Sequence, residues 1–282
     1  MHVGITVFLT DYTIPIIPLA QHMERLGFES LWLPEHPVIP GEMKTPFPGA
    51  SDGKLPDWYK RTLDPFVALA AAAGATKRLK LGTGICLVPE RNPLYTAKEV
   101  ASVDQVSNGR FMFGIGAGWL KEESDLFHVD FPRRWTQTRD HMLAMKALWA
   151  GELSGYQGKY VQFPPLYCHP KPVQKPHPPI LIAGELDKAA ERVADYGDGW
   201  FPRGRAVDPK RVEEGRKRIE ALYKARGRDT RQLTVSVFGA EASKASNRAF
   251  AAAGTDRVIH MIKSEDETRT LATLEKLASE LL

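Results

Sequence analysis

The chain has little cysteine and no long apolar run. Its 282 residues include only two cysteines, Cys86 and Cys168, and no Cys/His spacing typical of zinc sites. No apolar stretch approaches the roughly 18 residues that a membrane-spanning helix needs. The first ten residues lack a basic segment followed by an apolar core, so we expect no signal peptide. These absences argue against a disulfide scaffold and a membrane protein, and they predict a soluble, cytoplasmic protein with reduced thiols.

Other familiar signals are also missing. The formal net charge of +4, spread over the whole length, is too small to indicate nucleic-acid binding. The sequence has no HExxH metal motif, no GxSxG nucleophile elbow and no Walker loop. We therefore expect no metal site, and neither a hydrolase nor a kinase finds support.

Short β-branched runs alternate with amphipathic segments along the whole chain. Strands are expected at residues 3–8, 29–34, 79–85, 110–116, 180–184, 198–202, 233–239 and 256–262. Helices are expected at about 18–26, 62–77, 92–107, 135–150, 187–196, 211–226, 245–253 and 267–281. Residues 34–57 are predicted to form a functional loop, and 151–179 to be irregular.

Eight strand–helix units predict an α/β fold, a (β/α)₈ TIM barrel. We expect one domain over residues 1–282, with loop insertions at the carboxyl-end face. The rival is a doubly wound open sheet, which would usually show a glycine-rich fingerprint after its first strand. The segment after that strand, VFLTDYTIP, contains no glycine.

Glycines cluster where two predicted strands end, in LGTGI around Gly84 and in GIGAGW around Gly116. In a barrel of this kind the carboxyl ends of the strands face the active site. Glycine there would let a flat ligand approach the backbone. A third glycine, Gly184, precedes a predicted helix whose first amides could bind a phosphate, although Asp187 could instead cap that helix.

One histidine also lies at a predicted strand end. The segment WLPEHP places Glu35 and His36 directly after the second strand. Imidazole is the side chain best suited to move protons near neutral pH, so His36 is the candidate acid/base. A purely structural loop histidine is the alternative.

Four blocks in this order resemble the luciferase-like monooxygenase superfamily over nearly the whole chain. They are GFESLWLPEH, LKLGTGICLVPERNPLYTAKEVASVDQVSNGRFMFGIGAGW, KPVQKPHPPILIAGE and YGDGWFP. More narrowly, they resemble its branch of flavin- or deazaflavin-dependent oxidoreductases.

The resemblance implies a cofactor site made largely of main chain. A non-proline cis peptide between Gly84 and Ile85 would form a bulge against the ring, and His36 would lie beside the reactive ring. Backbone amides after the fourth and fifth strands would hold the ribityl chain and phosphate. The implied cofactor-binding residues are Thr83, Gly84, Ile85, Gly116, Ala117, Gly118, Trp119, Gly184, Glu185 and Leu186.

Two departures limit the resemblance. Sugar-phosphate dehydrogenases of the superfamily have a glutamate proton donor where this chain has Trp119, which argues against the same substrate and mechanism. Trp119 could instead wall the pocket, stack on a ligand or pack in the core. The segment after the seventh strand is short, which argues against light emission.

The resemblance therefore implies an oxidoreductase that transfers a hydride between coenzyme F-420, a deazaflavin, and a small organic substrate. Residues 38–57 would cover the site. An FMN-dependent monooxygenase and a non-catalytic flavin-binding barrel remain alternatives. Barrels of this kind often pair, which leaves a homodimer open.

Overall fold

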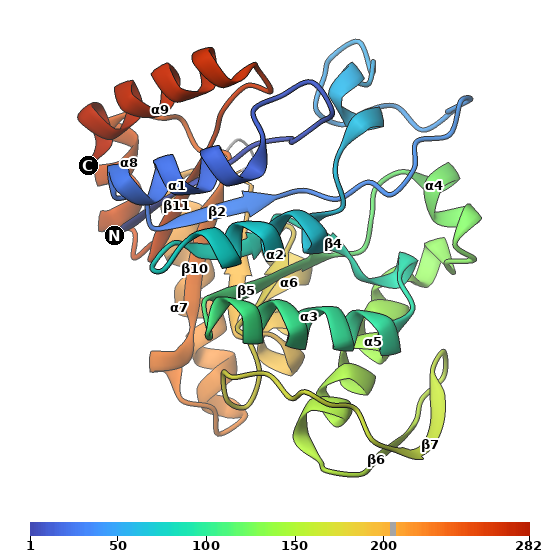
Figure 1. Cartoon of the computed structure of the whole chain (residues 1–282). Coiled ribbons are helices and arrows are strands. Elements are labelled where there is room, and N and C mark those ends of the chain that lie inside the picture. Colours follow the sequence, from blue (N-terminus) through green and yellow to red (C-terminus); the bar gives the residue numbers. More distant parts are fainter. Residues whose placement is uncertain (204–206) are drawn as a thin grey trace.

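A closed ring of parallel strands forms the centre of the computed structural model, which describes residues 1–203 and 207–282 (Figure 1). The strands of the ring are β1 (His2–Thr6), β2 (Ser30–Leu33), β3 (Lys80–Thr83), β4 (Cys86–Leu87), β5 (Phe111–Gly116), β8 (Ile180–Ala183), β9 (Gly199–Phe201), β10 (Thr234–Phe238) and β11 (Arg257–Met261). β1 pairs with both β2 and β11, and β5 joins β3 and β4 to β8, so the sheet closes on itself. The predicted eight-stranded (β/α)₈ barrel is confirmed, because β3 and β4 together occupy one position.

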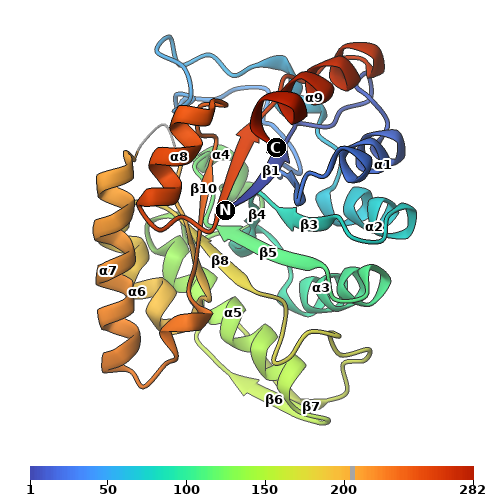
Figure 2. The ribbon, with the colours of Figure 1, turned by 90° about the vertical axis from the view of Figure 1, so that its left-hand side faces the viewer.

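The helices lie around the outside of this ring (Figure 2). They are α1 (Ile16–Leu26), α2 (Pro65–Ala75), α3 (Pro93–Ser107), α4 (Lys121–Leu126), α5 (Arg134–Ala150), α6 (Leu186–Tyr196), α7 (Pro209–Ala225), α8 (Lys244–Ala252) and α9 (Glu267–Leu281). Their ends follow the local chemistry read from the sequence. Asn92 caps α3 by accepting from the amides of Leu94 and Tyr95, and Asn108 ends it in the left-handed conformation with φ 54°.

The third barrel strand is interrupted between β3 and β4. The peptide bond from Gly84 to Ile85 is cis, as the resemblance implied, and it lies between the two halves. The amide of Gly84 still donates to the carbonyl of Leu33 at 2.7 Å. The break therefore leaves the barrel closed, while β4 continues the pairing with β5 toward the rim.

Two elements differ from the sequence prediction. Residues predicted to be irregular include an antiparallel hairpin, β6 (Ser154–Gln157) and β7 (Gln162–Leu166), outside the barrel. Pro164 and Pro165 concealed β7, yet a strand of a two-stranded hairpin tolerates proline because one of its edges needs no amide donor. The short helix α4, directly after β5, was also missed; it is the element that later completes the site.

The barrel interior is filled by side chains. Trp32, Met112, Leu181, Phe201 and Ile259 form a cluster inside the ring, each at most 5% exposed. A larger apolar cluster packs between the strands and the helices. Because the interior is filled, the barrel offers no central channel, and in barrels of this kind the functional residues lie at the rim, where the carboxyl ends of the strands meet the loops.

Candidate active site

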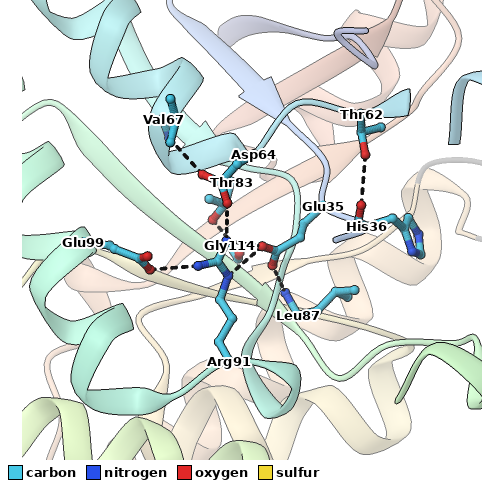
Figure 3. Close-up of polar contacts among 10 residues, drawn as sticks. All are labelled: Glu35, His36, Thr62, Asp64, Val67, Thr83, Leu87, Arg91, Glu99 and Gly114. Carbon is cyan, nitrogen blue, oxygen red and sulfur yellow. Dashed lines mark hydrogen bonds and ion pairs between the residues drawn. The ribbon is translucent and has the colours of Figure 1, made fainter. Parts of the chain in front are cut away.

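His36 follows β2 and is enclosed at the carboxyl rim. Its side chain is only 6% exposed. The ring nitrogen Nδ1 lies 2.6 Å from Oε2 of Glu123 on α4, and Nε2 accepts a hydrogen bond from the indole Nε1 of Trp119 at 3.3 Å. The backbone carbonyl of His36 accepts from the Thr62 hydroxyl at 3.1 Å (Figure 3). The structure thus brings together two predicted site residues, His36 and Trp119, and adds Glu123.

Aromatic side chains surround this histidine. The ring centroid of Tyr59 lies 5.2 Å from that of His36, and Trp119 lies 5.9 Å away edge-on. Phe47, from the loop predicted to cover the site, contacts both Tyr59 and Trp119 at centroid distances of 5.0 and 5.5 Å. Trp119 is therefore a wall of the site, one of the roles that the sequence left open.

The covering loop is tied to α4 by one carboxylate. Oε1 of Glu122 accepts the backbone amides of Lys44 at 2.7 Å and Thr45 at 3.0 Å. Glu122 and Glu123 are consecutive, so one helix holds the loop from one side chain and His36 from the next. Helix α4 therefore contacts both the covering loop and His36.

Glu35, the neighbour of His36, has a structural role. Its carboxylate accepts the Leu87 amide and the Arg91 Nε–H, each at 2.6 Å. Arg91 also pairs with Asp64 and Glu99, and so joins the His36 loop to α2 and α3 (Figure 3). Burial disfavours the Arg91 charge, but these carboxylates outweigh it and raise the pKa of the guanidinium. Of the two adjacent residues in WLPEHP, Glu35 anchors the loop and His36 faces the site.

A second buried carboxyl, Glu90, lies behind Glu123. Its Oε1 accepts from the Ser124 hydroxyl at 2.7 Å, and the residue is 6% exposed. Burial, together with the charge of Glu123, raises the pKa of Glu90 to about 8. Glu90 is consequently neutral at pH 7.

Protonated Glu90 gives a testable stability effect. Its pKa rises from an ordinary 4.5 to about 8 on folding, so between these values the folded chain holds a proton that the unfolded chain releases. Stability therefore falls as pH rises through this window, by at most about 1.4 kcal/mol per pH unit. Glu90→Gln has no titrating group at this position, so its free energy of unfolding lacks this pH dependence. In urea unfolding, the free energy of unfolding of Glu90→Gln minus that of the wild type should increase by about 2 kcal/mol from pH 6 to pH 7.5. A constant difference would contradict a neutral Glu90.

The two glycines at the ends of the third and fourth barrel strands, Gly84 and Gly116, lie close to side chains of the protein itself. A Cβ on Gly116 would overlap the side chain of Ile85, and one on Gly84 would lie 3.1 Å from the Phe238 ring. Side chains of the protein itself therefore occupy these two directions, and the contact of Gly116 with a cofactor ring stays a prediction. Ile85, which is half-buried at the break in the third strand, occupies the space beside Gly116.

Three other predicted binding residues, Thr83, Ala117 and Gly118, lie at or just after the ends of β3 and β5. The hydroxyl of Thr83 is buried and donates to the carbonyl of Gly114 at 2.7 Å, so it serves the barrel (Figure 3). Ala117 is 3% exposed. Gly118 has a φ of +78°, which favours glycine, and its carbonyl accepts from Arg134 at 3.1 Å.

The start of α6 has the features of an anion site. Gly184 has a φ of +129°, and among the described residues a Cβ added there would meet only the Cβ of Ala189, at 4.0 Å. Glu185 takes the N-cap position, and no side chain caps the helix, so Asp187 does not cap it. Asp187 instead pairs with Arg211 and Arg218 at 3.0 and 3.1 Å. The arginines offset the charge of Asp187, one of the two carboxylates near the helix start that would repel an anion.

Sequence reasoning missed Glu123, Phe47 and Tyr59. Glu123 is 87 residues from His36, and no local pattern pairs the two. The available signal was its spacing: it lies four residues after Trp119, at the beginning of a helix that directly follows the glycine block.

A family model described as luciferase-like monooxygenase matches residues 15–278. The chain belongs to the luciferase-like monooxygenase family. An uncharacterised protein of Mycobacterium tuberculosis is 38% identical over 231 residues, covering 81% of this chain and 80% of the relative. Within residues 1–203 and 207–282, no group of three or more His, Cys, Asp or Glu side chains is arranged to bind a metal ion. No helix in those ranges combines the length and apolarity that crossing a bilayer requires.

Solved structures of luciferase-like enzymes share the fold. Monooxygenase RslO1 from Streptomyces bottropensis has a TM-score of 0.77 at 23% identity, covering 100% of this chain and 98% of that one. An F-420-dependent secondary alcohol dehydrogenase has a TM-score of 0.75 at 16% identity, covering 98% and 97%. The FMN-bound oxygenating component of 3,6-diketocamphane monooxygenase from Pseudomonas putida has a TM-score of 0.62 at 20% identity, covering 84% and 66%.

Proposed function

We propose that this luciferase-like oxidoreductase uses coenzyme F-420 and transfers a hydride between it and a small organic substrate. The observation that carries the proposal is His36, enclosed at the carboxyl rim by aromatic side chains and bonded at both ring nitrogens. Gly184, Glu185 and Leu186 would hold the phosphate, and Ile85, Gly116 and Trp119 would lie beside the ring. The bound deazaflavin would supply a two-electron hydride carrier.

His36 would move the proton that accompanies the hydride. In the oxidation of an alcohol, the bound deazaflavin would accept the hydride from carbon, and the hydroxyl proton would pass to Nε2 of His36. The substrate hydroxyl takes the place of the Trp119 N–H on that nitrogen. In the reverse direction the imidazolium returns the proton to the carbonyl oxygen. Phe47 and Tyr59 exclude water while this transfer takes place.

The overall length of the chain matches that of an F-420-dependent enzyme. The chain spans 97% of the F-420-dependent alcohol dehydrogenase but only 66% of the FMN-bound diketocamphane enzyme. An FMN-dependent monooxygenase is the second candidate, because the chain also spans 98% of the RslO1 monooxygenase. A non-catalytic flavin-binding barrel is the third candidate, because a buried histidine bonded at both nitrogens can also have a purely structural role.

Cofactor titration tests the proposal. We expect the purified protein to bind F-420 saturably, by fluorescence or calorimetry, and to bind FMN weakly. We also expect substrate-dependent F-420 reduction without oxygen. Saturable FMN binding without F-420 binding, with oxygen uptake coupled to reduced FMN, would support the monooxygenase instead. Binding without any turnover across a panel of alcohols, aldehydes and ketones would favour the non-catalytic barrel.

A further inference from the structure

The two contacts of the His36 ring specify one neutral tautomer. The Trp119 indole N–H can only donate a hydrogen bond, so Nε2 must be the acceptor. The proton of neutral His36 is therefore on Nδ1, where Glu123 Oε2 accepts it at 2.6 Å. In this tautomer both ring nitrogens of His36 have a hydrogen-bond partner, whereas the other neutral tautomer could form neither hydrogen bond.

Glu123 is a buried carboxylate with few other partners. Its side chain is 1% exposed, and its second oxygen, Oε1, has no hydrogen-bond partner among the described residues. The nearby carboxyl group, Glu90, already accepts from Ser124, and the same two carboxyls lie close enough for their charges to interact. Two buried carboxyls cannot both ionise cheaply, and the charge of Glu123 is one of the causes that raise the pKa of Glu90.

We propose that Glu123 is the positioning residue of His36. Its carboxylate keeps the proton on Nδ1 and holds the ring so that unprotonated Nε2 faces the site. When Nε2 accepts a proton, the same carboxylate stabilises the imidazolium across a short, charge-assisted hydrogen bond. The catalytic consequence rests on the function proposed above, whereas the tautomer is a property of the resting protein.

Nuclear magnetic resonance tests the resting protein without any cofactor. In protein labelled with ¹⁵N-histidine, the His36 signals are assigned by their absence from His36→Asn. We expect the proton on Nδ1, with a downfield resonance typical of a short bond to a carboxylate. That resonance should move upfield in Glu123→Gln and stay in place in Glu90→Gln. A proton on Nε2 in the wild type, or an unmoved resonance in Glu123→Gln, would overturn the inference.

Kinetics tests the consequence with the same matched pair. Glu123→Gln should lower kcat by about 10²-fold or more, because the base loses its charged support. Glu90→Gln makes the same isosteric change in the neighbouring buried carboxyl and should alter kcat by no more than about two-fold, since Glu90 is already neutral. Equal losses in the two variants would mean that burial of a carboxyl, rather than pairing with His36, is what matters.

A double variant shows whether Glu123 acts through His36. His36→Asn with Glu123→Gln should be as slow as His36→Asn alone, because the supported base is already gone. Losses that multiply would assign Glu123 a separate role and overturn the inference. If the resonance results hold but His36→Asn turns over at the wild-type rate, the function proposed above fails while the pairing stands.

Discussion

Replacing His36 with asparagine is expected to lower kcat by about 10²–10⁴-fold while the protein stays folded. The asparagine amide can still donate to Glu123 from nearly the position of Nδ1, so the buried carboxylate keeps a partner. The variant lacks Nε2, the atom that the substrate proton would reach. Binding of F-420 should change little, because the residues proposed to hold its phosphate lie between β8 and α6 and at the start of α6.

The measurement is steady-state reduction of F-420 together with a thermal melt. His169→Ala is the matched control, because the side chain of that histidine is 46% exposed and pairs with a surface carboxylate, Glu152, at 3.2 Å. The control should keep the activity of the wild type. Turnover by His36→Asn at the rate of the control would refute a role for His36 in proton transfer.

Replacing Arg91 with methionine is expected to reduce the free energy of unfolding by about 3–5 kcal/mol. The Arg91 side chain is 14% exposed and the Glu35 side chain 2%, so the pair is largely removed from water. Methionine has a similar length but no charge, and it would leave the Glu35 carboxylate buried with only the Leu87 amide. The contacts to Asp64 and Glu99 would also be lost.

Denaturant unfolding measures this effect. Arg231→Met is the control, because Arg231 also pairs with an aspartate, Asp229, but its side chain is 88% exposed. An exposed pair adds little to stability, so the control should unfold like the wild type. We also expect Arg91→Met to lose activity below its melting temperature, because Glu35 is adjacent to His36. Equal midpoints for the two variants would contradict the anchoring role.

The barrel could be predicted because parallel strands buried on both faces have a plain sequence signature. β5, for example, reads FMFGIG and is buried at every position. Helix ends followed from single residues such as Asp64 and Asn92, whose side chains cap α2 and α3. These features depend on a few neighbouring residues, and the printed sequence contains all of that information.

The site was only partly predictable. His36 was found because it follows a strand directly, but its partner Glu123 comes from a helix 87 residues away. The glycines do lie where strands end, but a one-dimensional pattern does not say that Ile85 fills the space beside Gly116. Periodicity indicates which face of a strand or helix a residue lies on. The residues that it contacts from distant parts of the chain are known only from the three-dimensional structure.

The pairing of β1 with β11 has a consequence for synthesis on the ribosome. His2 of β1 pairs with Arg257 of β11 in the ring, so one edge of β1 stays unpaired until β11 has left the ribosome. During that interval β1 can pair only with β2, and its other edge is open to chance association with other chains. Closure thus depends on contacts between opposite ends of the polypeptide, and such contacts form slowly. Nascent chains stalled before β11 should be the form most in need of a chaperone.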